Sequence, residues 1–261
     1  MTRAAIMSTD SDLTRATRYS IPFFLLLIPI WRAKVASTVP EPYLDEEFHV
    51  GQAQTYWAHK WSQWDDRITT PPGLYFYSYI ICAALLLLRG GPKELDAEAL
   101  RTTNTAASAV LLPWRLQTLS DSVQGERNTR PAGARLGPTV LNICLFPPLF
   151  FFSGLYYTDI VALLAVVEAY NWDIKRSAEK SSMGPLLVFL MLGVGALLFR
   201  QTNIFWVAVF LGGLRIARML RRSSRDCAES DIKGIAIRSS KNELYDPTVA
   251  EASAVGECVR S

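Results

Sequence analysis

Acidic, histidine and tryptophan side chains gather in one short stretch, from Tyr43 to Thr70, between two apolar runs. The stretch holds five carboxylates, both histidines of the chain and three of its seven tryptophans. Asp45, Glu46 and Glu47 are consecutive, and three neighbouring acids near apolar surface do not all ionise without cost. A carboxyl group with a pKa tuned in this way is suited to act as a general base. The simpler alternative is a solvated acidic turn after the sequence "PEP".

Helical spacing relates this acid cluster to the side chains that follow it. His49 lies one helical turn after Asp45 and Glu46, and Gln52 and Tyr56 continue the same face. The pattern predicts a short helix with one polar face, lying at a membrane surface. Tryptophans anchor such helices where water meets lipid, and the stretch offers Trp57, Trp61 and Trp64.

Metal ligation is the weaker interpretation of these residues. Glu46 and His49 have a spacing found in carboxylate metal sites, but such sites use two copies and the chain has one. The four cysteines have no metal-binding spacing. The sequence therefore predicts no metal site and no certain cofactor, and it leaves open whether a divalent cation assists.

The distribution of apolar residues indicates a helical membrane protein. Half of the residues are hydrophobic and the mean hydropathy is +0.15, with apolar runs at 74–88 and 186–199 and a polar segment after Arg218. A net charge of +3 without a basic stripe argues against nucleic acid as a partner. We expect an all-α, polytopic fold surrounded by membrane lipid.

Arginine residues predict which side of the membrane each connector faces. Three arginines precede the first apolar run and five follow the last, and such clusters mark the cytosolic side. The first loop, residues 37–70, is then luminal, and so are Asp159 and Arg200. The expected divisions are a cytosolic N-terminus (1–18), a transmembrane module (19–218) and a disordered cytosolic tail (219–261).

The number of spans between residues 71 and 157 stays open. Both ends of this segment are predicted to be luminal, so an even number of its three apolar stretches crosses. Either residues 71–88 lie in the interface, or the stretch around Thr105–Trp114 does not span. The second is favoured because that stretch has barely half of the about 20 apolar residues that a span needs, and because Pro113 and Arg115 shorten it.

A second set of candidate residues belongs to the same luminal side. Asp159 ends the sequence "FFSGLYYTD", and Arg200 and Gln201 begin "RQTN" at the end of an apolar run. An ionisable group at membrane depth indicates function, and arginine is suited to bind phosphate. Snorkelling at a helix end is the alternative for Arg200. In the first loop, Trp64 and Asp65 suit sugar binding, or else are an interfacial tryptophan beside a solvated acid.

Four segments resemble, in order and character, the dolichyl-phosphate-glucose-dependent α-1,2-glucosyltransferase family of the endoplasmic reticulum. They are "YLDEEFHVGQAQTYWAHKWSQWDDRITTPPGLY", "LRTTN", "LFPPLFFFSGLYYTD" and "LLFRQTN". That family adds the terminal glucose to the lipid-linked oligosaccharide before N-glycan transfer. The resemblance extends from Tyr43 to Phe210.

The resemblance implies a membrane-embedded glycosyltransferase of the lipid-phosphate-donor type in the endoplasmic reticulum membrane, with interfacial helices in its first luminal loop. Its donor would be dolichyl phosphate glucose, its acceptor the lipid-linked oligosaccharide, and the reaction would invert the glucose C1. Asp45 is the expected base, and Glu46 and Asp159 are further catalytic candidates. Substrate contacts are expected from His49, Gln52, Gln54, Trp64, Asp65, Tyr157, Arg200 and Gln201.

The chain also departs from the family pattern. Members continue further, with more spans after a large cytosolic loop, whereas this chain passes into a polar tail and stops at Ser261. The alternative hypothesis is a truncated, catalytically inactive remnant of the enzyme.

Overall fold

Helices are the only regular secondary structure in the described part of the chain. The computed structural model describes residues 25–90, 95–125, 137–178 and 183–218, and no strand occurs among them. The all-α prediction is confirmed for these residues. The predicted cytosolic N-terminus and the predicted disordered tail lie outside them. The chain divides into two compact units, Met1–Val207 and Ala208–Ser261, and every residue of the site described below belongs to the first.

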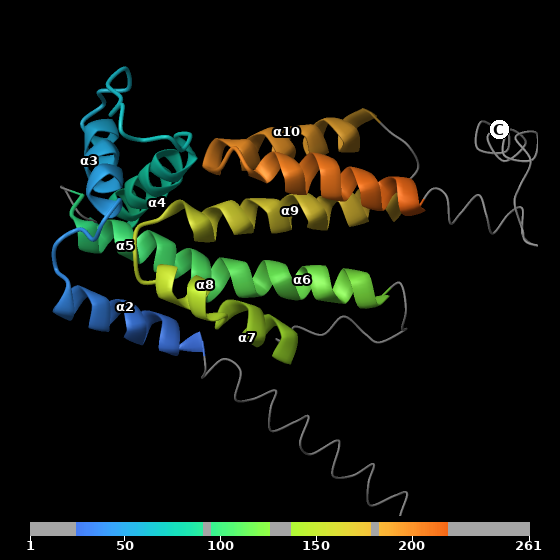
Figure 1. Cartoon of the computed structure of the whole chain (residues 1–261), viewed down its shortest axis with the longest axis horizontal. Coiled ribbons are helices and arrows are strands. Elements are labelled where there is room, and N and C mark those ends of the chain that lie inside the picture. Colours follow the sequence, from blue (N-terminus) through green and yellow to red (C-terminus); the bar gives the residue numbers. More distant parts are fainter. Residues whose placement is uncertain (1–24, 91–94, 126–136, 179–182, 219–261) are drawn as a thin grey trace, which may run out of the picture. The chain divides into compact units, whose positions relative to one another are not determined.

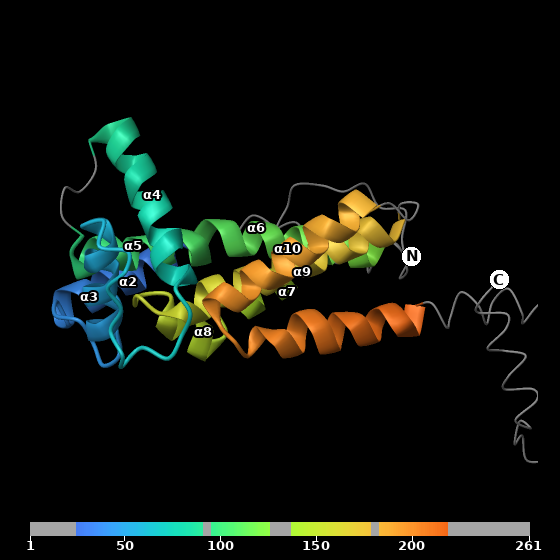
Figure 2. The same cartoon turned by 90° about the horizontal axis from the view of Figure 1, so that it is seen from above.

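The helices succeed one another along the chain (Figure 1). Their bounds are α2 Leu27–Thr38, α3 Glu46–Trp57, α4 Gly73–Arg89, α5 Ala97–Ala106, η1 Ala107–Leu111, α6 Leu112–Gly125, α7 Pro138–Cys144, α8 Pro147–Phe152, α9 Thr158–Ala178, α10 Met183–Phe199 and η2 Phe205–Phe210. In the first unit, α9 packs lengthwise between α6 and α10. Figure 2 shows that α4 is inclined to these three helices.

Local chemistry sets several helix ends. The Asp96 side chain accepts a hydrogen bond from the backbone N–H of Ala99 at 2.7 Å and so caps the N-terminus of α5. Gly90 ends α4 with a left-handed φ of 67°, which a residue without a Cβ adopts at low cost. Pro147 begins α8, where its missing N–H leaves no helical bond unmade.

One long helical stretch runs through α5, η1 and α6. Proline lacks an N–H and its ring collides with the carbonyl four residues earlier, so Pro113 is an unfavourable residue in the interior of a helix. The helix instead continues through Pro113 to Gly125. The preceding turn, Ala107–Leu111, is π-helical, and the wider turn makes room for the proline ring.

A buried cluster beneath α3 holds the first loop on the bundle. It joins α3 to α4, α5 and the start of α9 through apolar side chains that include Val50, Leu74, Leu100 and Ile160. Tyr156 is buried in this cluster, and its hydroxyl pairs with the Ser78 hydroxyl at 2.7 Å. Both hydroxyl groups are therefore satisfied without water.

Among the residues that the structure describes, no helix combines the length and the apolar character needed to cross a bilayer.

Close contact between α4 and α10 makes Gly73 a sensitive position. A Cβ added at Gly73 would lie 2.5 Å from the carbonyl oxygen of Leu198, which belongs to the backbone and has little freedom to move. Gly73→Ala is expected to lower the free energy of unfolding by about 1–3 kcal/mol. Gly51→Ala in α3 is the control, because no atom lies within 4 Å of its added Cβ. Denaturant unfolding of both variants measures the difference, and equal stability would contradict the close packing.

Candidate active site

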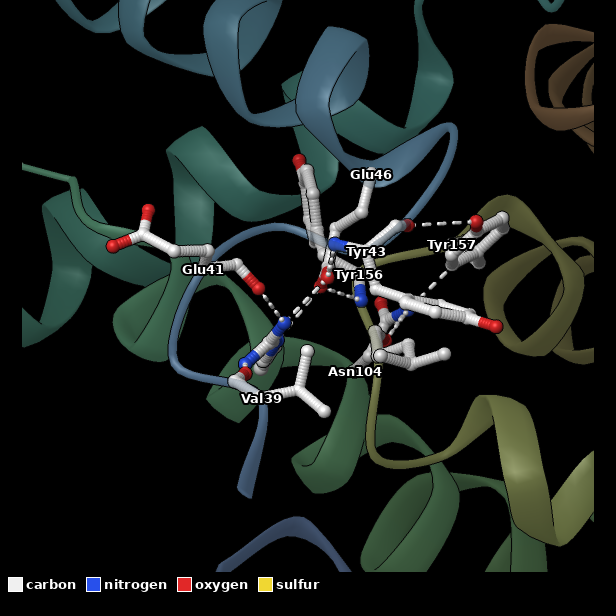
Figure 3. Close-up of polar contacts among 9 residues, drawn as sticks. Val39, Glu41, Tyr43, Glu46, Asn104, Tyr156 and Tyr157 are labelled. Atoms are coloured by element: carbon white, nitrogen blue, oxygen red, sulfur yellow. Dashed lines mark hydrogen bonds and ion pairs between the residues drawn. The ribbon is translucent and has the colours of Figure 1, made fainter. Parts of the chain in front are cut away.

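A buried ion pair ties the first loop to the rest of the fold. The Arg101 Nε donates to Glu46 Oε1 at 2.8 Å and its Nη2 donates to Oε2 at 2.6 Å. Glu46 is 0% exposed and Arg101 is 1% exposed. The Arg101 guanidinium also donates to two carbonyl oxygens in the loop before α3, those of Val39 at 2.8 Å and Glu41 at 3.0 Å (Figure 3). Arg101 therefore holds the whole approach to α3.

The Glu46 carboxylate also accepts hydrogen bonds from two backbone N–H groups, which lie far from each other in the sequence. The Tyr43 N–H donates to Oε2 at 2.9 Å and the Tyr156 N–H donates to Oε1 at 2.7 Å. Each oxygen thus accepts two hydrogen bonds, which is the full satisfaction that a buried carboxylate needs. Glu46 thereby joins the first loop to the loop before α9, 110 residues further along the chain.

Asp45 has the opposite environment from its neighbour Glu46. It immediately precedes α3, its side chain makes no capping hydrogen bond to that helix, and the residue is exposed. The two consecutive carboxylates thus differ in burial. Glu46 is engaged in the interior, while Asp45 is accessible to a molecule that approaches from outside.

His49 is buried on the inner face of α3 and contacts aromatic side chains from other parts of the chain. Its Nδ1 is 2.7 Å from the Tyr75 hydroxyl, and the residue is buried. Burial lowers the pKa of His49 below its ordinary 6.5, and the negative charges of Asp45, Asp159 and Glu46 act in the opposite direction. The His49 ring also meets the Tyr157 ring edge-on, with ring centroids 6.0 Å apart, so His49 lies where the first loop meets the loop before α9.

Asp159 and Arg200 form an ion pair beside this site. Asp159 is in the first turn of α9, and the Arg200 Nη1 donates to its Oδ1. The Arg200 side chain remains 43% exposed, which leaves part of the guanidinium open to a further anion. The next residue, Gln201, is exposed in the same turn. Arg200 is thus a fixed cation and not a freely snorkelling one.

The helix face that the sequence predicted as polar and surface-lying is the buried face of α3. Glu46, His49, Gln52 and Tyr56 are all buried. The prediction failed because these side chains find their polar partners inside the fold. Gln52 illustrates this, since its side chain donates to the Gln63 carbonyl at 2.8 Å and accepts from the Asp65 N–H at 2.9 Å.

Other predicted substrate contacts are also engaged within the protein. Gln54 donates to the Leu95 carbonyl at 2.7 Å. Asp65 forms a two-point ion pair with Arg67, at 2.9 and 2.7 Å, which lowers the pKa of Asp65 to about 2. The Tyr157 hydroxyl donates to the Tyr43 carbonyl at 3.1 Å.

Exposed aromatic rings cover the outer side of this region. Trp61 stacks on Phe76, with ring centroids 6.1 Å apart, and Trp64 meets Tyr75 edge-on. Trp61 and Trp64 both keep large exposed surfaces. Their rings are therefore available to lipid or to the apolar face of a sugar.

A family model described as the DIE2/ALG10 family matches residues 39–255, which include all four segments quoted above. The chain belongs to this family. Relatives from Aspergillus fumigatus and Emericella nidulans are 65% and 63% identical over 93% and 94% of this chain. A relative from Arabidopsis thaliana is 36% identical over 65% of this chain and 32% of its own length. All three are named "Dol-P-Glc:Glc(2)Man(9)GlcNAc(2)-PP-Dol alpha-1,2-glucosyltransferase".

The chain spans about two fifths of the length of the first two of these relatives. No solved structure matches it. The family resemblance drawn from the four segments is confirmed.

In this DIE2/ALG10 family member, Arg101 and Asn104 are site residues that sequence reasoning did not single out. Asn104 donates from Nδ2 to the carbonyl oxygens of Leu155 at 3.0 Å and Tyr157 at 2.6 Å, so α5 holds the loop before α9 as well as the first loop. The sequence pattern that points to these two residues is "LRTTN", whose arginine and asparagine are one helical turn apart and share a face. Among the described residues, no cluster of three acidic, histidine or cysteine side chains is able to hold a metal ion.

An apolar cavity of about 360 Å³ extends from Phe199, next to Arg200, into the bundle. Its walls come from α4, α9, α10 and the η1–α6 helix, and include Tyr77, Val161 and Ala196. Its polar end is the ion pair between Arg115 and Glu168. The cavity therefore offers space for an apolar chain.

Removing the cation of the buried pair should destabilise the fold. In Arg101→Met, the Glu46 carboxylate stays buried without its partner, which costs about 3–5 kcal/mol of the free energy of unfolding. The matched control is Arg32→Met, because Glu98 in that pair is 65% exposed and such pairs contribute about 0–1 kcal/mol. Denaturant unfolding measures both variants. Equal losses would mean that the Arg101 pair does not hold the loop.

Acid should destabilise the chain through His49. Because burial holds the folded-state pKa of His49 below 6.5, the unfolded state binds more protons as the pH falls through that value. The free energy of unfolding should therefore fall below about pH 6.5, by at most about 1.4 kcal/mol per pH unit from this group. His49→Gln should remove this contribution, while His59→Gln, at the exposed histidine of the same loop, should retain it. An unchanged pH profile in His49→Gln would contradict the assignment.

Proposed function

We propose that this chain transfers glucose from dolichyl phosphate glucose, in α-1,2 linkage, to the lipid-linked oligosaccharide. Family membership and the printed names of the relatives support this activity. The observation that carries the proposal is that Glu46, the neighbour of exposed Asp45, bonds the Tyr156 N–H in the loop that leads to the Asp159–Arg200 pair. This arrangement offers a base and a phosphate-binding cation in one site.

Asp45 is the general base in this mechanism. Its carboxylate takes the proton from the 2-hydroxyl of the acceptor glucose while that oxygen attacks C1 of the donor glucose. The bond between C1 and the phosphate oxygen breaks, and dolichyl phosphate leaves with the electron pair. Attack opposite the leaving group inverts C1, so a β-linked donor gives an α-linked product.

Arg200 stabilises the departing phosphate. Negative charge grows on the phosphate as its bond to C1 breaks, and a cation held in place beforehand stabilises that charge without reorganising. Asp159 holds Arg200 through the ion pair and is thereby a positioning residue. The cavity that begins at Phe199 accommodates part of the isoprenoid chain of the donor.

The first loop supplies contacts for the sugars. The exposed ring of Trp64 stacks on the C–H face of a sugar, and Tyr157 and Gln201 contribute hydrogen bonds from the side of α9 and α10. Gln52, Gln54 and Asp65 contribute indirectly, because their side chains brace the loop. His49 acts in the same way, because it is buried and hydrogen-bonded to the Tyr75 hydroxyl.

The membrane setting belongs to the same proposal. The chain is a polytopic protein of the endoplasmic reticulum membrane, with residues 37–70 and the turn after α10 in the lumen. The distribution of arginine residues along the sequence supports this topology. A lipid-linked donor and acceptor also favour a site at the membrane surface.

Expression in cells that lack this glucosyltransferase tests the proposal. The chain should convert the accumulated acceptor, which lacks one glucose, into the fully glucosylated lipid-linked oligosaccharide. Asp45→Asn keeps the shape of the side chain but removes the base, and should lower transfer at least about 100-fold. Chromatography of the released oligosaccharides measures the two forms.

The matched control is Asp66→Asn, which removes the same charge from an exposed residue of the same loop and should leave transfer unchanged. Persistent accumulation of the acceptor with the unaltered chain would support the inactive remnant. Full activity of Asp45→Asn would show that another group is the base.

A further inference from the structure

We propose that the Glu46–Arg101 pair is a positioning device that holds Asp45 in its reactive place, and that backbone strain at Leu44 is part of this device. The inference rests on the proposed function, because it concerns the base of that reaction. It assigns different roles to two adjacent carboxylates that the sequence could not tell apart.

Leu44 adopts a backbone conformation that its own side chain does not favour. Its φ is 52°, in the left-handed region where the Cβ of a non-glycine residue crowds the backbone. The side chain is 69% exposed, so little packing of its own compensates this strain. Such a conformation persists only where the surroundings impose it.

The surroundings that impose it are the groups attached to the buried pair. Glu46 accepts from the Tyr43 N–H, and the Tyr157 hydroxyl donates to the Tyr43 carbonyl. On the other side, the Glu47 N–H donates to the Leu44 carbonyl at 3.2 Å. Hydrogen bonds thus fix the backbone on both sides of Leu44. The chain reverses its direction at this residue, between the loop and α3.

This reversal separates the two carboxylates. Glu46 enters the interior and meets Arg101, while Asp45 remains exposed at the start of α3. Glu46 also holds the Tyr156 N–H, three residues before Asp159. The same carboxylate therefore sets the position of the base and of the loop that carries the Arg200 pair.

Glu46 is unsuited to be the base itself. Its two oxygens accept four hydrogen bonds, two of them from a guanidinium. A proton on Glu46 would displace one of these donors and leave Arg101 buried without its counter-charge. Asp45 takes up a proton without such a loss because it is exposed.

Arg101→Lys tests the device while keeping the positive charge. Lysine cannot reproduce the two-point contact together with the bonds to Val39 and Glu41. Glucose transfer at saturating donor and acceptor should fall about 100-fold, as expected for a displaced catalytic group, while the KM values stay within about threefold. Hydrogen exchange at the Tyr43 and Tyr156 amides should accelerate, because both donate to Glu46. The control Arg32→Lys, at an exposed pair, should change neither readout.

Relief of the strain provides a second, independent test. In the Arg101→Lys background, Leu44→Gly makes the left-handed conformation easy to hold and should recover about fivefold in rate. Leu44→Ala removes the same side chain but keeps the Cβ, and should recover nothing. Equal rates for the glycine and alanine variants would remove Leu44 from the device.

The outcomes separate this inference from the proposed function. Full transfer by Arg101→Lys, with both amides exchanging faster, would overturn the positioning role. Unchanged protection of both amides in Arg101→Lys would overturn it as well, whether or not the chain transfers glucose. Inactivity of the unaltered chain would count against the proposed function alone, and amide exchange would then decide the inference.

Discussion

Burial of a carboxylate and a guanidinium away from water is costly, and a fold keeps such a pair only when each polar atom has a partner. Glu46 and Arg101 meet this condition through contacts that reach three separate parts of the chain: the loop before α3, α5 and the loop before α9. The rest of the site depends on this pair. Without this pair, no ion pair would join the first loop to α5, and nothing would fix which acidic side chain faces the interior.

A consequence of this arrangement is the division between groups that hold the site and groups that remain free to react. Glu46 and Gln52 have their polar side-chain atoms engaged within the protein, and Asn104 engages its side-chain amide nitrogen. Asp45 and part of Arg200 remain open to ligands. Rigid support around a few accessible groups is the arrangement that transfer between two bound sugars requires, because misplacement of the base by about 1 Å lowers the rate steeply.

Much of this site was predictable from the sequence. The acid cluster, the "YYTD" loop and Arg200 were predicted to share the luminal side, and in the structure Glu46 accepts from the Tyr156 N–H while Arg200 pairs with Asp159. It did not distinguish Asp45 from Glu46, because two adjacent acids differ only in where the backbone turns. That turn depends on Leu44 and on Arg101, which lies 55 residues further along the chain. Helical periodicity also identified the face of α3 correctly but placed it outside, since polar side chains at helical spacing do not reveal that their partners are buried.

The most direct test is an electron cryo-microscopy structure of the chain in a lipid nanodisc with an unreactive donor analogue and the acceptor oligosaccharide. We expect an Asp45 carboxylate oxygen to lie within about 3 Å of the acceptor 2-hydroxyl, while Glu46 stays bound to Arg101. A Glu46 carboxylate released from Arg101 and bonded to that hydroxyl, with Asp45 turned away, would contradict this expectation.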